Sequence, residues 1–288
     1  MSLYLLDAYN LLFRSFCSLP SSILGPDEKP INAIYGMLGF LLRLQREAGA
    51  GHLVAAFDTP EVPTFRHRLY PEYQAQRGPM GGEKAGDFER QIHLAQRLLP
   101  ALGITCLTAP GFEADDILGT LAQRAKGGKT AAHVVSTDRD VLQLVGGGIT
   151  VVTPDSTLKR FQNDEDVRAR LGVTAGGVPA WKSLAGDASD NIPGVSGIGA
   201  KTASRLVNEF GTLDRIYESL HLVEPRSRKL LIAGRKQANL FLEVVTIRTD
   251  LEIDLDPNRL DRHHLHGETR VRPLIDRAFD ATASESTA

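Results

Sequence analysis

Short apolar runs alternate with longer amphipathic segments over residues 3–152, and this alternation constrains the fold more than any other feature. The apolar runs have the length of buried strands and lie at residues 3–6, 53–57, 104–107, 133–136 and 149–152. Helical patterns separate them at residues 31–49, 87–102, 113–126 and 138–145. Strands that alternate with helices in this way indicate an α/β fold, with a parallel sheet covered by helices on both faces.

The second half of the chain has a different pattern. Beyond a boundary at about residues 155–175, short helical patterns follow one another, punctuated by glycine and proline. We therefore expect an α/β domain over residues 1–170 and a smaller all-helical domain over residues 171–275. The last residues, ATASESTA, have almost no apolar content, so we expect a disordered tail over residues 276–288.

Composition excludes several classes of protein. Hydrophobic residues make up 42% of the chain, enough for a core, and the formal net charge is −2, so a nucleic-acid partner would need a local basic patch. The two cysteines, Cys17 and Cys106, lie outside any zinc or disulfide pattern. There is no basic leader at the start and no apolar run of bilayer length, so we expect a cytoplasmic protein without a membrane partner.

Acidic residues follow the ends of the predicted strands. In open parallel sheets the carboxyl ends of the strands lie at one edge, where ligands bind, so these acids should meet there. Any one of them could be a helix cap or a turn residue, but together they would repel one another strongly without a counter-charge. The seven acids are Asp7, Asp58, Glu113, Asp115, Asp116, Asp138 and Asp140.

Divalent cations are the natural counter-charge for such a cluster. Carboxylates without histidine or cysteine suit Mg²⁺ or Mn²⁺, and two such ions suit phosphodiester hydrolysis. A further pair, Asp187 and Asp190 in LAGDASDNIPG, would face the same way on a helix or tight turn. The alternative for this pair is an Asx-turn before Pro193.

Two segments have the character of nucleic-acid contacts. In GVSGIGAKTASRLVNEFG (residues 194–211), Gly197 and Gly199 allow close backbone approach, and the following helix start with Lys201 suits phosphate. A plain helix cap and turn is the alternative. In FRHRLYPEYQAQR (residues 65–77), basic residues interleave with tyrosines, as in surfaces that bind a nucleic-acid strand, although a solvated helix face would look similar.

Five motifs in order carry a family resemblance: LLDAYNLLFRS, AAFDTPEVPTFRHRLYPEYQAQR, GFEADDILGTLA, VSTDRDVLQLV and LAGDASDNIPGVSGIGAKTA. With these, the chain resembles the bacterial flap endonuclease or 5′-nuclease family, which includes the 5′–3′ exonuclease domain of DNA polymerase I. The resemblance runs over residues 3–255. It implies a PIN-like nuclease domain with a helical arch at residues 66–95, followed by a helix-hairpin-helix (H3TH) domain.

The resemblance also implies roles for individual residues. The carboxylates matching the first metal site are Asp7, Asp58, Glu113, Asp115 and Asp116, and those matching the second are Asp138, Asp140, Asp187 and Asp190. The residues matching DNA contacts are Arg14, Arg66, Tyr73, Gln74, Arg77, Gly197, Gly199, Lys201 and Thr202. Relatives often hold K⁺ in the hairpin, which here would use the backbone carbonyls of Val195 and Ile198.

Two positions depart from the family pattern. Ala8 stands where a glycine usually follows the first aspartate, which is a mild change. Gln74 stands where the arch motif usually has a lysine that helps to activate the scissile phosphate. Glutamine donates a hydrogen bond but has no charge, so it should stabilise developing negative charge less well. Lys84 or Arg77 could compensate.

The function that the resemblance implies is that of a structure-specific 5′-nuclease in replication and repair. It would hydrolyse DNA at single-strand/double-strand junctions with divalent-metal-activated water, using two Mg²⁺ or Mn²⁺ ions when substrate is bound. Its partners would be flap, nicked or gapped DNA of any sequence, RNA primers in hybrids, and a DNA polymerase in cis or in trans, and the protein would be a monomer. The alternatives are a catalytically weakened junction-binding protein and a PIN-like single-strand ribonuclease.

Overall fold

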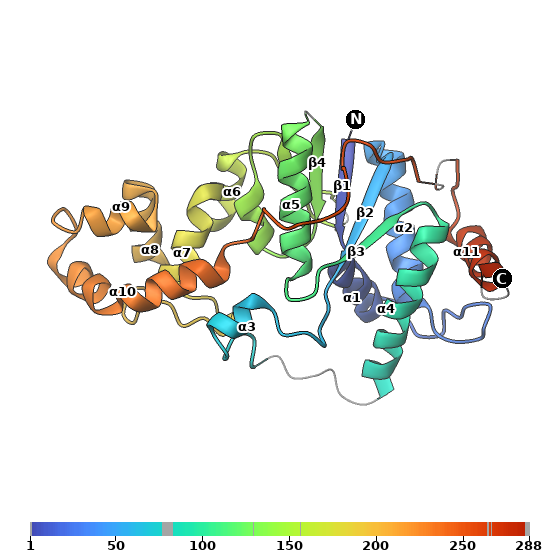
Figure 1. Ribbon diagram of the computed structural model, residues 1–288, viewed down its shortest axis with the longest axis horizontal. Helices are drawn as coiled ribbons and strands as arrows, with labels where there is room; N and C mark the ends of the chain where they lie inside the picture. The colour runs from blue at the N-terminus through green and yellow to red at the C-terminus, as the bar shows by residue number, and fades with distance from the viewer. Residues whose placement is uncertain are drawn as a thin grey trace.

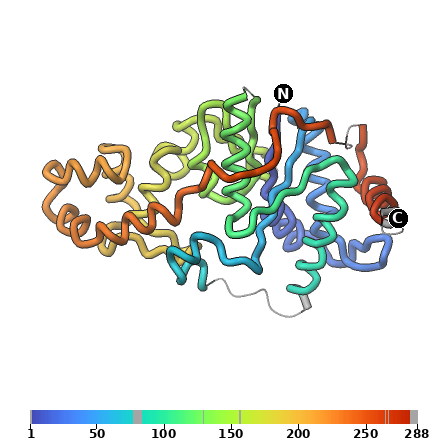
Figure 2. The backbone as a smooth tube through the Cα atoms, viewed as in Figure 1, coloured from blue at the N-terminus to red at the C-terminus, as the bar shows by residue number. Residues whose placement is uncertain are grey.

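The computed structural model of the chain describes residues 2–76, 83–128, 130–155, 157–263, 265 and 267–285. A sheet lies between two groups of helices, and a helical unit that includes α7 to α10 extends from one side of it (Figure 1). From that unit the chain returns across the sheet and ends in helix α11 on the opposite side (Figure 2). The chain thus has an α/β part, a helical part and a C-terminal return.

The sheet has the order β3-β2-β1-β4-β5-β6. Its first five strands pair in parallel, as the alternating sequence pattern predicts, whereas the short β6 pairs antiparallel with β5. The mostly parallel sheet therefore has one reversed edge strand that the sequence pattern did not indicate. The strands are β1 Ser2–Asp7, β2 His52–Phe57, β3 Thr105–Thr108, β4 Ala131–Val135, β5 Ile149–Val152 and β6 Arg160–Phe161.

The helices of the α/β part are close to their predicted positions, with three exceptions. Helices α1 and α3 were not among the predicted helical patterns, and the predicted helix at 138–145 is the shorter 3₁₀ helix η1. The α-helices of this part are α1 Ala8–Ser18, α2 Asn32–Ala48, α3 Phe65–Leu69, α4 Glu83–Ala101, α5 Ala114–Gly127 and α6 Asp164–Leu171, and η1 is Asp140–Leu144.

Two apolar cores lie on the two faces of the sheet, because successive strand residues point to opposite faces. Leu3 and Leu5 of β1 point into the core that contains α5, and this core continues into the helical part. Tyr4 and Leu6 point into the core that contains α2 and α4. The core that contains α5 is therefore common to the sheet and the helical part, and it holds the two together.

The helical part is built from short helices around tight loops. Its elements are η2 Ala175–Gly177, α7 Val178–Ala185, η3 Ala188–Asp190, α8 Ala200–Phe210, α9 Leu213–Glu218 and α10 Pro225–Val245. After α10 the chain runs back along α5, where Arg124 donates hydrogen bonds to the carbonyls of Leu251 and Ile253. This return segment ties the two parts together.

The prediction of a disordered tail from residue 276 is wrong for the residues that the structure describes. Helix α11, Val271–Glu285, packs against α4 and α2 in the α/β part. The prediction relied on the polar residues at the end of the chain. The side chains that hold the helix in place lie just before them and are fully buried: Leu274, Ile275 and Ala278.

The acidic edge forms where the parallel strands end. Asp7 is the last residue of β1, Asp58 follows β2, and α5 begins after β3 with Glu113 as its N-cap. The parallel arrangement thus brings distant segments to one place, as predicted. Over the parts of the chain that are described, no helix is both long enough and apolar enough to cross a membrane.

Candidate functional site

The first acidic group is built from residues at the ends of β1, β2 and β4 and at the start of α5. Asp7 caps α1 by accepting a hydrogen bond from the Asn10 backbone (3.0 Å), and it also accepts one from the Ser136 hydroxyl (2.7 Å). Asp58 accepts a hydrogen bond from the Ala114 backbone at 2.7 Å, which fixes the start of α5 beside β2. We refer to Asp7, Asp58, Glu113, Asp115 and Asp138 as the first group.

The carboxylates of the first group repel one another, and this repulsion shows in their pKa values. Burial and the neighbouring Asp58 raise the pKa of Asp7 to about 7. Burial also raises the pKa of Asp115 well above its usual value, and Asp138 and Asp7 add to the effect. Among the described residues, no donor or cation pairs with the Asp115 carboxylate. The group therefore has an uncompensated negative charge that a bound cation would relieve.

Asp138 lies with the first group. The resemblance assigned it to the second metal, yet its charge acts on Asp7 and Asp115. Its backbone N–H donates to the Ser136 hydroxyl (3.0 Å), and its carboxylate accepts from the Asp140 backbone (2.8 Å). Asp138 thus connects the first group to the segment that supplies the second.

Asp116 does not fit the predicted role of a metal ligand. Its carboxylate is fully buried and forms a bidentate ion pair with Arg66, with N–O distances of 2.6 and 2.9 Å. The same two oxygens accept hydrogen bonds from the backbone of Glu113 (3.0 Å) and Arg248 (2.8 Å). Since each oxygen accepts two hydrogen bonds, neither has a lone pair left to bind a cation.

Arg66 was predicted to contact DNA, but its guanidinium is buried in this ion pair. It lies 3.5 Å from the Glu113 carboxylate and donates to the Val244 carbonyl of α10 at 3.0 Å. Burial works to lower the pKa of Arg66, but the charges of Glu113 and Asp116 outweigh it and raise the pKa. Arg66 therefore stabilises the acidic site through buried contacts with Asp116, Glu113 and α10.

Tyr73 was also predicted to face DNA, and the structure places it inside. Only 4% of Tyr73 is exposed, and it packs among Ile192, Phe241 and residues at the end of α10. Its hydroxyl lies 3.3 Å from the Glu113 carboxylate. The basic and aromatic segment 65–76 therefore joins the acidic site to the helical part, a role that the composition of the segment did not indicate. Arg77 lies outside the described residues.

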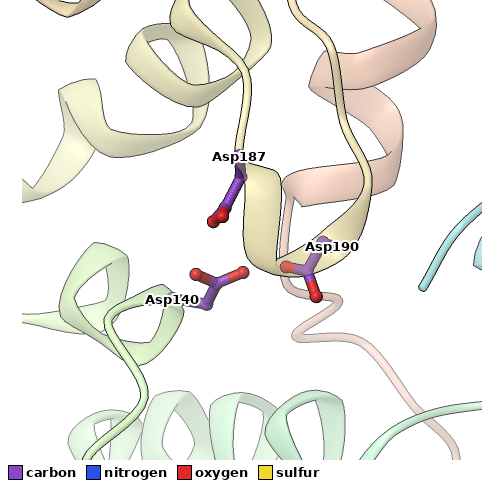
Figure 3. A group of neighbouring side chains, drawn as sticks. All are labelled: Asp140, Asp187 and Asp190. Atoms are coloured by element: carbon purple, nitrogen blue, oxygen red, sulfur yellow. The ribbon is translucent and has the colours of Figure 1, made fainter. Parts of the chain in front are cut away.

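The second acidic group is the triad of Asp140, Asp187 and Asp190, whose carboxylates converge from η1 and from the segment around η3 (Figure 3). One oxygen from each lies within 4.8 Å of the others, a spacing that suits three ligands of one ion. Asp187 forms the Asx-turn that was the alternative for this pair, since its carboxylate accepts from the Ser189 backbone at 2.9 Å, and the same turn brings the Asp190 carboxylate close to that of Asp187. The triad is thus positioned to bind a metal.

Two residues that the triad contacts were missed or undervalued in the sequence. The buried Lys182 of α7 forms ion pairs with Asp140 and, at 2.5 Å, with Asp187. Burial works to raise the pKa of Asp187, but the Lys182 charge and hydrogen bonds outweigh it and lower the pKa. Gln74 donates to Asp190 at 3.0 Å and to the Tyr73 hydroxyl at 2.9 Å. The sequence signal for Lys182 was a lone lysine in an otherwise apolar helix.

The hairpin after the triad has the shape that its glycines require. Gly194 has φ +68°, and a Cβ there would lie 2.4 Å from the Gly186 backbone nitrogen. The backbone at Gly194 can therefore lie this close to Gly186 only because residue 194 has no side chain. Gly197, Gly199 and Lys201 are exposed, and α8 begins just after Gly199. The start of α8 thus faces solvent with unpaired backbone donors nearby.

The other residues predicted to contact DNA or K⁺ differ in exposure. Arg14 is exposed on α1, and Thr202 is half-buried in the first turn of α8. The side chains of Val195 and Ile198 are buried, and the Ile198 backbone donates to the Val195 carbonyl at 2.9 Å. Gln74 has φ +54°, which is unusual for a residue with a side chain.

Both acidic groups consist of side chains that a divalent cation prefers, and among the described residues the triad is the group with three ligand atoms at the spacing of a single ion. Every potential ligand is a carboxylate oxygen, and hard ions such as Mg²⁺ and Mn²⁺ prefer oxygen. Burial and the neighbouring Asp58 raise the pKa of Asp7 to about 7, and burial with nearby carboxylates raises that of Glu113 to about 7 although Arg66 works to lower it, so a bound cation would stabilise the charged form of both. A parallel sheet with such an edge and an adjoining helical part defines a metal-dependent nuclease.

The chain belongs to the 5′–3′ exonuclease family. Residues 2–172 match the model of its N-terminal resolvase-like domain, and residues 173–268 match that of its C-terminal SAM fold. The thermostable DNA polymerase I of Thermus filiformis is 38% identical over 90% of this chain, and DNA polymerase I of Mycobacterium tuberculosis is 37% identical over 98%. The chain spans only 30% and 32% of these two relatives.

A solved structure supports the fold. The D15 protein of bacteriophage T5, crystallised with metal ions, superimposes with a TM-score of 0.68 at 20% identity and covers 99% of both chains. The expected fold class, with its α/β nuclease part and its helical part, is therefore confirmed.

Proposed function

We propose that this chain hydrolyses phosphodiester bonds in DNA at junctions between single and double strands, as a structure-specific 5′-nuclease in replication and repair. One observation carries the proposal: two carboxylate groups lie side by side, linked through Asp138 and Asp140, next to an exposed glycine hairpin. Among similar folds, the T5 D15 flap endonuclease was solved with DNA and metal ions, and the catalytic core of Rad2 with a DNA substrate.

In this proposal the carboxylates hold Mg²⁺ or Mn²⁺. The first group would bind one ion and the triad a second. Such ions supply an activated water and stabilise charge on the leaving oxygen. The Asp116–Arg66 ion pair connects α5 with α3 and the end of α10, and in this way it would position Glu113 and Asp115 for the metal.

The hairpin would bind the duplex backbone. Exposed N–H groups at the start of α8, together with Lys201, suit phosphate oxygens, and such contacts do not depend on base sequence. Carbonyls of Val195 and Ile198 would hold K⁺ at this loop. Gly197, Gly199 and Thr202 complete the surface, and Arg14 would contact the strand near the acidic edge.

A DNA polymerase would be the partner, in cis or in trans. Curated relatives are DNA polymerases I of which this chain matches about a third. The substrates would then include RNA primers in RNA/DNA hybrids. Addition of a polymerase to a nicked template tests this: coupled strand displacement and cleavage should exceed cleavage by the nuclease alone.

Cleavage of a 5′-flap DNA in Mg²⁺, Mn²⁺ or EDTA tests the activity. The wild-type protein should cleave near the junction in either metal and not in EDTA. Asp115→Asn should lose at least about a hundredfold in rate while still binding the flap, since even residues that only support a metal site affect activity 10–100-fold. Asp254→Asn, an identical change at an exposed position, is the control.

The other outcomes separate the alternatives. A protein that binds the flap tightly without metal-dependent cleavage would be a junction-binding protein. Cleavage of single-stranded RNA without any preference for a junction would indicate a PIN-like ribonuclease. Either result would overturn the proposal.

A further inference from the structure

The second acidic group already contains a positive charge that belongs to the protein. Lys182 lies on α7 with its side chain 4% exposed, and its ammonium contacts both Asp140 and Asp187. The third carboxylate of the triad, that of Asp190, accepts a hydrogen bond from Gln74. Each member of the triad thus has a donor from the protein.

The two acidic groups differ in this respect. In the first group Arg66 lies 3.5 Å from Glu113, but no cation or donor among the described residues pairs with the Asp115 carboxylate. In the triad, by contrast, Lys182 lowers the pKa of Asp187 against the effect of burial. The Asp115 carboxylate thus lacks a counter-charge from the described residues, whereas one ammonium already balances part of the charge of the three triad carboxylates.

We infer that the Lys182 ammonium acts as a built-in counter-ion at the triad, which a divalent cation must displace from Asp140 and Asp187 before it can bind there. An ammonium and a divalent cation in contact with the same two carboxylates repel each other, so both do not hold the triad at once. Lys182 would therefore keep the second metal position weak until substrate phosphate adds further ligands. In this role Lys182 is a positioning residue that controls metal loading.

A buried lysine at this place has a structural reason as well. Three carboxylates near one another without a cation would destabilise the folded protein, and so would a buried lysine charge without a partner. The lysine and the carboxylates therefore offset the cost of burying one another. The inference rests on the proposed function only in treating the triad as a metal site, and it can be measured without DNA or turnover.

Titration of the metal-free protein with MnCl₂, followed by calorimetry and by the EPR signal of free Mn²⁺, tests the inference. The wild-type protein should bind one ion well and a second weakly. Lys182→Met should bind the second ion about 10- to 100-fold more tightly, the usual range of coupling between two sites. Lys182→Arg keeps the charge and should keep the second ion weak, and Lys236→Met is the control at an exposed lysine.

A double variant assigns the affected ion. In Asp115→Asn/Lys182→Met the first ion should weaken, while the gain at the second remains. If Lys182→Met does not fold in EDTA, Lys182→Gln, which keeps a hydrogen-bond donor without the charge, replaces it with the same expected gain.

An unchanged or weakened second binding step in the neutral Lys182 variants would overturn the inference. Equal tight binding of two ions by the wild-type protein would also overturn it. Failure of the proposed function would look different, because the Mn²⁺ titration would follow the expected pattern while flap DNA remained uncut.

Discussion

Arg66 and Asp116 form a buried bidentate ion pair that joins three separate elements behind the acidic edge. Arg66 lies in α3, Asp116 in the first turn of α5, and the Arg66 Nε donates to the Val244 carbonyl at the end of α10. The pair therefore links the base of the predicted arch, the first acidic group and the helical part. Loss of the ion pair should therefore disturb the position of all three.

Arg66→Met should destabilise the protein by about 3–5 kcal/mol, because it leaves the Asp116 carboxylate buried without its partner. Chemical unfolding monitored by circular dichroism measures the change. Arg68→Met, two residues further along the same helix but exposed, should have little effect. Equal stability of the two variants would contradict the role given to Arg66.

Added Mg²⁺ should stabilise the protein more at pH 8 than at pH 5. The pKa values of Asp7 and Glu113 are raised to about 7, so both are protonated at pH 5 in the folded, metal-free protein. A cation must then displace these protons, at a cost of roughly 3 kcal/mol for each group two pH units below its pKa. The shift of Tm between EDTA and Mg²⁺, measured across this pH range, should grow as pH rises and level off above 7.

A shift of Tm that stayed constant with pH would show that these two carboxyl groups do not bind the ion. The comparison with EDTA at each pH cancels the effects of groups that the metal does not touch.

Asp115→Asn should raise the Tm of the metal-free protein at pH 8. Burial and neighbouring carboxylates raise the pKa of Asp115, so at this pH the folded protein must either bury its charge or protonate it, both at a cost in stability that the neutral amide removes. In Mg²⁺ the order should reverse, since the variant has lost a ligand. Differential scanning calorimetry in EDTA and in Mg²⁺ tests both signs, and Asp254→Asn should move neither. A lower Tm in EDTA would contradict the repulsion argument.

Gln74→Lys should raise the single-turnover rate of flap cleavage by about tenfold or more at saturating metal, because it adds a positive charge beside the acidic site. The Gln74 amide already reaches Asp190 and the Tyr73 hydroxyl, so the new ammonium would lie close to the reacting phosphate. Gln123→Lys, at an exposed position on α5, controls for general attraction of DNA. If the cleavage rate rises equally in both variants, or in neither, the absence of a charge at Gln74 does not limit the rate of the wild-type protein.

Leu274→Ala should destabilise the protein by about 2–5 kcal/mol, the cost of emptying a buried leucine site. Leu274 is fully buried where α11 packs on the α/β part. Leu222→Ala makes the same change at a residue that is 64% exposed and should have almost no effect. Urea unfolding measures both changes. If Leu274→Ala left the free energy of unfolding unchanged, the expectation of a disordered tail would hold after all.

Much of the fold and of the acidic edge could be predicted from the sequence because both follow from order along the chain. Parallel strands all end at one edge, so an acid that follows a strand is placed there whatever packs around it. Asp7, Asp58 and Asp138 are examples. The Asp187–Asp190 turn is partly local, since the Asp187 carboxylate accepts from the Ser189 backbone, although Gln74 also donates to Asp190 from 116 residues away.

Only the tertiary structure decided which charges meet. Arg66 and Asp116 are 50 residues apart, and Lys182 and Asp140 are 42 apart, so neither pair leaves a pattern in the sequence. A motif position also does not distinguish an acid that faces a cation from one that a buried arginine neutralises, as Asp115 and Asp116 illustrate. The sequence by itself determined that carboxylates gather at one edge of a parallel sheet. The packing of α3, α5, α7 and α10 determined which of them remain available to a metal, because burial and ion pairing depend on elements that the chain brings together only when it folds.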